Sequence, residues 1–249
     1  MMNDYVIVIK NIVKAFKVGT QNVLVLDNVS MNVREGDFLI IYGPSGCGKS
    51  TLLHVLLGLE EPTSGEIYVF NKNIYNNTSE DDRSEFRKNN IGMIYQQPNW
   101  VKSLSVLENI AFPLLLLGLD KMSANQKAVQ LLTSIGMMDW ADYYTSELSS
   151  GQQQKIALAR ALIIDPKIIV ADEPTGNLDF QSGQELMQLL SEHNVNGKTV
   201  IMVTHDLEYL KYAKQAIKMF NGRIVEEDRK INKETIMDGI KTKRGRPTA

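Results

Sequence analysis

The hydrophobic pattern near the start of the chain predicts short β-strands. Residues 5–9 are almost continuously apolar, and apolar positions recur through 23–26 and at alternate positions in 29–33. The run Asp37–Tyr42 lies between two glycines and is too short for a typical helix. Its continuous apolar character is typical of a strand buried on both faces of a parallel sheet. We therefore expect a β-rich N-terminal region followed by a core strand.

The rest of the chain alternates predicted helices with predicted core strands. Apolar residues at helical spacing and helix start signals predict helices at Lys49–Leu59, Lys121–Ile135, Gly151–Ile163 and near Ser182–His193. Two fully apolar runs, Ile168–Ala171 and Val200–Val203, predict further strands. Because no convincing strand occurs between about Leu104 and Leu162, we expect a helical lobe inserted into an α/β core.

Composition narrows the class of protein. The chain has 249 residues, a net charge of -2, 43% hydrophobic and 22% charged residues, which is ordinary for a globular protein and argues against a disordered, collagen-like or membrane-embedded chain. The longest apolar run, Ile110–Leu117, is too short for a transmembrane helix. The single cysteine, Cys47, cannot form an internal disulfide, and Met1–Asp4 lacks the features of a secretory signal. A cytoplasmic protein is expected.

The final residues form a small basic tail. Residues 241–249 carry four basic side chains and no acidic one, whereas the preceding body is weakly acidic. Such a tail either contacts anionic lipid or nucleic acid, or is a solvated terminus. The small number of charges favours the solvated terminus.

A phosphate-binding loop, or P-loop, follows the first core strand. Gly43–Ser50 fits the pattern G-x-x-x-x-G-K-[ST] and lies between a predicted buried strand and a predicted helix. In that position backbone N–H groups and the helix N-terminus surround phosphate oxygens. Lys49 then reaches the β- and γ-phosphates, and the Ser50 hydroxyl ligates Mg²⁺. This context favours nucleoside triphosphate binding over a glycine-rich turn with a surface lysine.

A pair of acidic residues ends the apolar run 168–171. Asp172 is the carboxylate expected on the metal side, and Glu173 is expected to polarise a water aimed at the γ-phosphate. By itself Glu173 is also compatible with a solvated acid at a strand end. Pro174, together with the P-loop upstream, favours the functional interpretation.

Two further features have complete structural explanations. Ser149 and Gln152 fit the S-x-x-Q capping box at the start of a helix. His205, just after a predicted strand, is compatible with an ordinary hydrogen-bonded histidine. Only the combination of motifs assigns either of them to a site.

Taken together, residues from about Tyr5 to Val225 resemble the nucleotide-binding subunits of ABC transporters. The resemblance rests on several motifs in a fixed order: Gly43–Thr51, Gln96, Leu148–Gln152, Asp172–Pro174, Asn177–Asp179 and His205. It implies a P-loop NTPase core with a mostly parallel sheet, an N-terminal antiparallel β subdomain and an inserted α-helical subdomain. The implied ATP-binding domain spans 1–226, with the helical subdomain at about 98–163 and a C-terminal extension at 227–249.

The resemblance also implies a role for each motif. Phe16 would stack on adenine, with Tyr5 as a rival and a buried strand aromatic as the alternative for either. The remaining ATP-binding residues would be Gly43, Pro44, Ser45, Gly46, Cys47, Gly48, Lys49, Ser50 and Thr51. Mg²⁺ would be held by Ser50, Gln96 and Asp172, and catalysis would involve Glu173, His205 and Gln96. Leu148, Ser149, Ser150, Gly151 and Gln152 would bind the γ-phosphate held by the opposite subunit, and Asp179 would lie at the dimer interface.

One position departs from the family pattern. The signature segment of the family, which corresponds to Leu148–Gln152 here, usually has two consecutive glycines. This chain has Ser150 followed by Gly151. An added hydroxymethyl group crowds the approach of the helix start to phosphate.

The motifs look most like the lipoprotein-release and macrolide-export branch of the family, supported by the similar segment Val106–Leu114. This placement implies an ATPase that forms a homodimer on ATP and docks on a transmembrane permease at the cytoplasmic face of the membrane, with no nucleic acid partner. We expect Ile110–Leu117 to contribute to the docking surface, with core burial as the alternative. The competing function is a non-transport ATP switch in DNA repair, chromosome maintenance or translation. That class is disfavoured because the chain has one P-loop, no long coiled coil and no zinc-type cysteine pairs.

Overall fold

The computed structural model describes residues 5–229, and its contacts divide the chain into two compact units. The first unit comprises the chain up to Arg83 together with the part that begins at Thr199, and the second comprises Ser84–Lys198. The helical insertion predicted at about 98–163 lies within the second unit.

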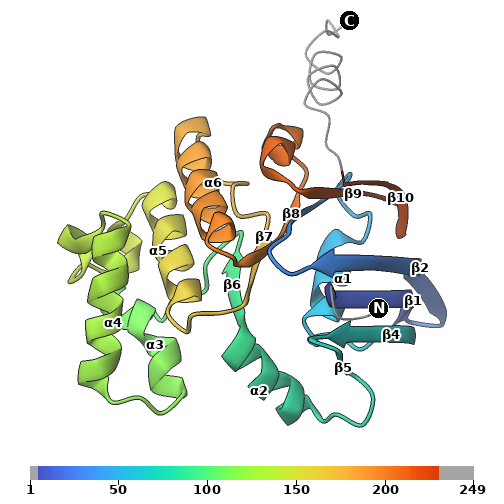
Figure 1. Ribbon diagram of the computed structural model, residues 1–249, viewed down its shortest axis with the longest axis horizontal. Helices are drawn as coiled ribbons and strands as arrows, with labels where there is room; N and C mark the ends of the chain where they lie inside the picture. Colours follow the sequence, from blue (N-terminus) through green and yellow to red (C-terminus); the bar gives the residue numbers. More distant parts are fainter. Residues whose placement is uncertain (1–4, 230–249) are drawn as a thin grey trace, which may run out of the picture. The chain divides into compact units, whose positions relative to one another are not determined.

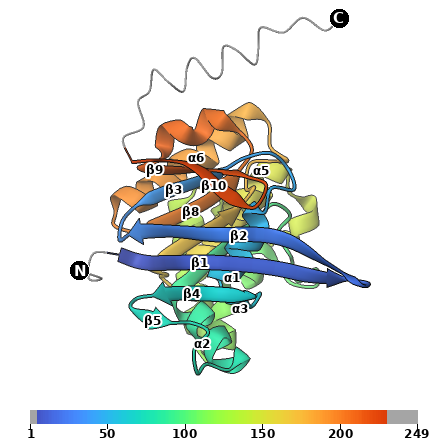
Figure 2. The same ribbon diagram turned by 90° about the vertical axis from the view of Figure 1, so that its right-hand side faces the viewer.

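An antiparallel sheet forms one part of the first unit. Its strands have the order β2-β1-β4-β5 (Figure 2). They are β1 (Tyr5–Val18), β2 (Gln21–Arg34), β4 (Ser64–Val69) and β5 (Lys72–Asn73). The short strands predicted from the pattern are therefore confirmed as parts of two longer ones, which continue through register shifts in the β1–β2 pairing.

A second group of strands in the first unit carries the P-loop. The order β10-β9-β3-β8 is formed by β3 (Phe38–Tyr42), β8 (Thr199–Thr204), β9 (Gln215–Phe220) and β10 (Arg223–Asp228). Strand β3 runs parallel to both β8 and β9, and residues 38–41 are at most 1% exposed. This confirms the predicted strand buried on both faces. A 3₁₀ helix, η3 (Leu207–Tyr212), connects β8 to β9.

Helix α1 (Lys49–Leu56) follows the P-loop and buries Leu52, Leu53 and Leu56. It is shorter than predicted. The helix ends before Gly58, whose φ angle of 69° is incompatible with a continuing right-handed helix.

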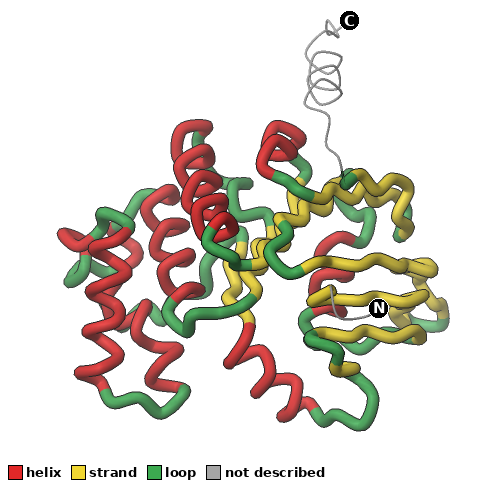
Figure 3. Tube along the Cα trace, viewed as in Figure 1, coloured by secondary structure: helices red, strands yellow, loops and turns green. Residues whose placement is uncertain are grey.

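The second unit combines two parallel strands with a group of helices. Strands β6 (Ile91–Tyr95) and β7 (Ile168–Asp172) pair in parallel. The helices, red in Figure 3, include α3 (Val106–Leu116), α4 (Lys121–Ser134), α5 (Ser150–Leu162) and α6 (Phe180–Val195). Short 3₁₀ helices are η1 (Met138–Trp140) and η2 (Thr145–Glu147). Helix α2 (Glu80–Asn90) spans the boundary between the units and has no buried residue.

Helices α3, α4 and α5 lie side by side (Figure 1). Their buried side chains form one hydrophobic core. Its members are small and branched side chains at helical spacing, including Ile110, Leu114, Ala128, Leu132 and Ile156. Because Ile110, Ala111 and Leu114 are at most 3% exposed, much of the apolar run expected at a docking surface belongs instead to this core. Leu116, at 62% exposed, is the member that projects outward.

Within the described residues 5–229, no helix is long and apolar enough to cross a membrane. The basic segment 241–249 lies outside the described residues.

Candidate functional site

The P-loop backbone requires glycine at both of its ends. Gly43 and Gly48 have φ angles of 157° and 103°. A β-carbon at Gly43 would lie 2.2 Å from the carbonyl oxygen of Met219, and one at Gly48 would lie 2.9 Å from that of Val25. Any larger residue would therefore displace backbone, which explains why the loop folds this way only with these glycines.

The same loop presents its positive groups at the start of α1. The N-cap residue is Gly48, which has no side chain to cap the first turn, so the capping role is left to another acceptor such as a phosphate oxygen. The ammonium of Lys49 donates hydrogen bonds to the carbonyl oxygens of Gly43 at 3.0 Å and Pro44 at 3.1 Å. This side chain is only 6% exposed, so its charge is held over the loop.

His205 and the P-loop leave the same edge of the sheet. In the parallel pairing of β3 with β8, Tyr42 lies opposite Thr204. Gly43 follows Tyr42 and His205 follows Thr204, so the two segments leave the sheet at neighbouring positions. The turn after His205 is fixed by a hydrogen bond from the Asp206 N–H to the Thr204 hydroxyl at 3.0 Å.

Phe16 lies near the C-terminal end of β1. The part of β2 that pairs with this end lies close to the P-loop. Phe16 pairs with Val23, and the carbonyl oxygen of nearby Val25 packs against Gly48. Tyr5 pairs with Arg34, at the opposite end of the same strand pair. The ammonium of Lys14 stacks on the Phe16 ring, 4.7 Å from its centre. This arrangement favours Phe16 over Tyr5 as the aromatic residue near a nucleotide on the P-loop.

A C-terminal hairpin that the sequence reasoning missed supports the P-loop. Strands β9 and β10 are joined by Asn221 and Gly222, whose φ angles are 48° and 76°. The Gly222 N–H donates to the carbonyl oxygen of Cys47 at 3.0 Å, and its own carbonyl oxygen accepts from the Asp27 N–H at 2.9 Å. An Asn-Gly pair between two strands is a strong hairpin signal and was available in the sequence.

In the second unit, β6 and β7 bring Gln96 close to the acidic pair. Tyr95 pairs with Asp172, so Gln96 and Glu173 both follow directly from paired strand ends. A β-carbon built on Gly176 would lie 2.8 Å from Nε2 of Gln96, so the glutamine side chain lies against the turn that follows Glu173. The carboxyl ends of parallel strands thus collect these polar groups at one edge.

Glu173 has an unusual backbone conformation. Its φ angle is 48°, a region that residues other than glycine rarely occupy. Its carbonyl oxygen accepts a hydrogen bond from the Gly176 N–H at 3.1 Å, which closes a tight turn. Backbone strain of this kind clusters at active sites and ligand-binding segments.

The predicted capping box at the start of α5 is confirmed. The Gln152 N–H donates to the Ser149 hydroxyl at 3.3 Å, and the Ser149 N–H donates to Oε1 of Gln152 at 2.9 Å. Ser150 is the exposed first residue of the helix. Within the described chain the Ser149 hydroxyl proton has no acceptor, so capping leaves this donor available to a ligand.

Gly151 packs tightly against the start of α6. A β-carbon at Gly151 would lie 2.6 Å from the hydroxyl oxygen of Ser182. Ser182 is itself held by Asp179, which accepts hydrogen bonds from its N–H at 2.9 Å and its hydroxyl at 2.8 Å. These two bonds lower the pKa of Asp179. The signature segment and Asp179 therefore lie close together on one face of the second unit.

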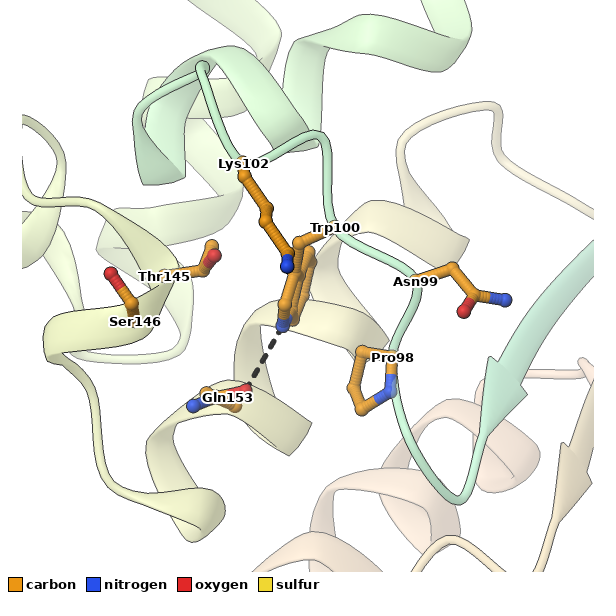
Figure 4. Close-up of a pocket in the computed structure, with 7 residues that line it drawn as sticks. All are labelled: Pro98, Asn99, Trp100, Lys102, Thr145, Ser146 and Gln153. Atoms are coloured by element: carbon orange, nitrogen blue, oxygen red, sulfur yellow. Dashed lines mark hydrogen bonds between the residues drawn. The ribbon is translucent and has the colours of Figure 1, made fainter.

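A pocket of about 410 Å³ lies beside the segment that follows Gln96 (Figure 4). The indole N–H of Trp100 donates to Oε1 of Gln153 at 3.0 Å, and Lys102 also lines the pocket. The guanidinium of Arg160 lies 4.3 Å from the Trp100 ring centre. Burial lowers the pKa of Arg160. Pattern analysis did not single out this pocket, because its residues come from three separate segments.

The predicted site residues fall into two sets. Phe16, the P-loop Gly43–Thr51 and His205 belong to the first unit, and Gln96, Leu148–Gln152, Asp172, Glu173 and Asp179 belong to the second. Within each unit the fold brings the predicted residues of neighbouring strand ends together.

Comparison with known proteins identifies the family. The profile of the family described as ABC transporter matches residues 26–176. The chain is 45% identical over 217 residues to an uncharacterized ABC transporter ATP-binding protein of Methanocaldococcus jannaschii, covering 87% of this chain and 96% of that protein. The chain belongs to the ABC transporter ATP-binding family.

A solved structure and a longer protein are also similar to this ABC ATPase. It resembles the dimeric post-hydrolysis structure of the ATP-binding cassette MJ0796 bound to ADP and Pi, with a TM-score of 0.83, 36% identity, and coverage of 89% of this chain and 97% of that one. It is 36% identical over 219 residues to the macrolide export ATP-binding/permease protein MacB of Psychrobacter arcticus, covering 88% of this chain but 33% of MacB.

These comparisons confirm the predicted P-loop fold, the ATPase class and the lipoprotein-release and macrolide-export branch. They give no support to the alternative of a non-transport ATP switch.

Proposed function

We propose that this ABC ATPase binds MgATP, dimerises on it, and uses its hydrolysis to drive a separate transmembrane permease of the export or lipoprotein-release type. The observation that carries the proposal is the P-loop, where Gly43, Gly48 and the buried Lys49 form a cradle for phosphate. The similarity to a dimeric cassette bound to ADP and Pi supports the dimer, and the similarity to MacB supports export.

In this proposal the first unit binds the nucleotide. The Lys49 ammonium exchanges its loop carbonyl acceptors for β- and γ-phosphate oxygens, and the first-turn N–H groups of α1 bind the remaining phosphate oxygens. Phe16 stacks on adenine through the ring face opposite the Lys14 ammonium. His205 acts near the γ-phosphate.

The donor set proposed for the metal fits Mg²⁺. Ser50 offers a hydroxyl, Gln96 an amide oxygen and Asp172 a carboxylate, all hard oxygen ligands that suit an ion which keeps several waters. When bound, Mg²⁺ offsets negative charge on the phosphates. The chain itself must hold these groups in place. For Gln96 and Asp172, the pairing of β6 with β7 and the turn that follows β7 would do this.

Glu173 is the proposed general base. Its carboxylate takes a proton from water as the water oxygen bonds to the γ-phosphorus and the bond from that phosphorus to the β-phosphate oxygen breaks, which yields ADP and phosphate. The strained turn at Glu173 fixes the direction of the side chain. The Ser149 hydroxyl and the start of α5 contribute donors to the nucleotide held by a second copy.

We propose the pocket beside Trp100 as part of the surface that receives the permease. Its aromatic ring, the nearby cations and the exposed Leu116 offer mixed contacts on the second unit. The proposed location is the cytoplasmic face of the membrane, reached through this partner.

Two measurements test the proposed function. The purified chain should hydrolyse ATP only with Mg²⁺, and the specific rate should rise with protein concentration because two copies share each nucleotide. When the chain is expressed in its own cells and recovered from membranes, a polytopic membrane protein should copurify with it. Recovery with nucleic acid or ribosomes and no membrane protein would contradict the transport assignment.

A further inference from the structure

Gln154 connects α5 to the end of β6. Its Nε2 donates hydrogen bonds to the carbonyl oxygens of Tyr95 at 3.1 Å and Gln96 at 2.8 Å. The residue is 3% exposed, and the amide uses both of its N–H groups. The amide orientation is therefore determined, because a flipped amide would place its oxygen against two carbonyl oxygens.

The oxygen of the Gln154 amide, unlike its nitrogen, makes no hydrogen bond within the described residues. This atom, Oε1, is buried. A methionine of similar size would avoid the cost of burying that oxygen without a partner. The favourable contribution of glutamine at this position therefore lies in the two bonds that it donates to the main chain at Gln96.

The same helix also holds the far end of the segment that begins at Gln96. Arg160 donates to the carbonyl oxygen of Asn99 at 2.7 Å and stacks on Trp100, which is in turn bonded to Gln153. Gln154 and Arg160 lie about 9 Å apart along the helix axis, at about 1.5 Å per residue. Two separated attachments hold a short segment against α5 more rigidly than either does alone.

We propose that Gln154 is a positioning residue for Gln96. By fixing the main chain at Gln96, it keeps the Gln96 side chain against the turn at Gly176, next to Glu173, where its amide oxygen serves Mg²⁺. The inference rests on the proposed function, since the metal role of Gln96 belongs to that proposal. Because α5 begins with Ser149–Gly151, Gln154 also ties the metal ligand to the helix that presents the signature.

The test measures metal requirement without measuring turnover. In a Glu173→Gln background, the Mg²⁺ concentration that gives half-maximal ATP-dependent dimer is determined by size exclusion with light scattering. We expect Gln154→Met to raise this concentration roughly threefold to tenfold, the factor expected for loss of a hydrogen bond. Gln96→Ala should raise it at least as much, and the double variant should not exceed Gln96→Ala alone.

Asn109→Leu is the matched control. Asn109 is 1% exposed, and its amide donates to the carbonyl oxygens of Val101, Leu104 and Ser105. It is therefore an equally buried amide that holds a later part of the same connection between β6 and α3, without contacting the main chain at Gln96. We expect this variant to lower the thermal unfolding midpoint without changing the Mg²⁺ requirement. An equal shift in the Mg²⁺ requirement of this variant would overturn the inference, since general loosening of the second unit would then explain both.

The remaining outcomes separate the inference from the proposed function. A shift with Gln96→Ala but none with Gln154→Met overturns the positioning role and leaves the metal role of Gln96 intact. No shift with Gln96→Ala overturns that metal role and the inference together. If Gln154→Met does not fold, Gln154→Asn replaces it, because its amide is kept but is one methylene too short to reach both carbonyl oxygens.

Discussion

The side-chain amide of Gln96 lies over Gly176, with its Nε2 2.8 Å from the position that a β-carbon on that glycine would take. The two residues follow different strands, β6 and β7, and meet because those strands pair in parallel. Gly176 thus provides space for a side chain that is proposed to bind Mg²⁺. The contact places Gln96, which is distant in sequence, against the turn that carries Glu173.

Gly176→Ala should reduce ATP turnover without unfolding the protein. The added methyl group meets the flexible end of the Gln96 side chain more closely than any backbone atom, so the amide is displaced and the turn is kept. We expect a severalfold higher Mg²⁺ requirement for hydrolysis and a thermal unfolding midpoint within a few degrees of wild type. A large drop in that midpoint would instead assign Gly176 to the stability of the turn.

Lys49→Ala should weaken nucleotide binding. The phosphates lose a charge-assisted donor worth roughly 1.5 to 3 kcal/mol, which corresponds to a loss of about tenfold to a hundredfold in affinity. Equilibrium binding of a fluorescent ATP analogue at fixed Mg²⁺ measures this effect. Lys127→Ala, which removes an exposed lysine from α4, is the control and should bind as wild type does. Equal affinities for all three proteins would exclude the phosphate role of Lys49.

Glu173→Gln should separate binding from hydrolysis. The amide preserves the shape of the side chain but cannot take a proton from water, so turnover should fall at least about a hundredfold while ATP still binds. The ATP-bound dimer should then accumulate on size exclusion. Glu192→Gln, an exposed change on α6, should leave turnover unchanged. Full activity of Glu173→Gln would place the general base elsewhere.

Ser150→Asp should abolish ATP-dependent dimerisation and spare nucleotide binding by the monomer. The new carboxylate stands at the exposed start of α5, where it would face the γ-phosphate held by the second copy. In the free subunit the same charge is compatible with the helix N-terminus, so the fold should be retained. Ser150→Gly should dimerise at least as well as wild type. Dimer formation by Ser150→Asp would place the signature away from the nucleotide.

Leu116→Ser should lower recovery of the permease without destabilising the ATPase. Leu116 is 62% exposed, whereas Leu114, two positions earlier, is 3% exposed and belongs to the helical core. Leu114→Ser should therefore cost roughly 2 to 5 kcal/mol of stability, in the range of large-to-small core changes. Thermal unfolding and copurification of the membrane partner distinguish the two leucines. Undiminished recovery with Leu116→Ser would remove this residue from the docking surface.

Local sequence determined the chemistry of this protein and most of its regular structure. The P-loop pattern at Gly43–Ser50, the strand ending in Asp172 and the capping box at Ser149 are all formed by residues within a few positions of one another. Their geometry depends on short-range properties, such as positive φ at glycine or a side chain that bonds to a nearby N–H. The structure bears out these features.

Tertiary structure alone decided which distant residues meet. No periodicity could show that Leu114 is buried while Leu116 is exposed, because that depends on where α4 and α5 pack against α3. The support of the P-loop by Gly222 and the bonds from Gln154 to Tyr95 and Gln96 join segments far apart in the chain. Such contacts form only when strands pair and helices pack, since a buried polar group takes its partner from whichever element the fold places beside it.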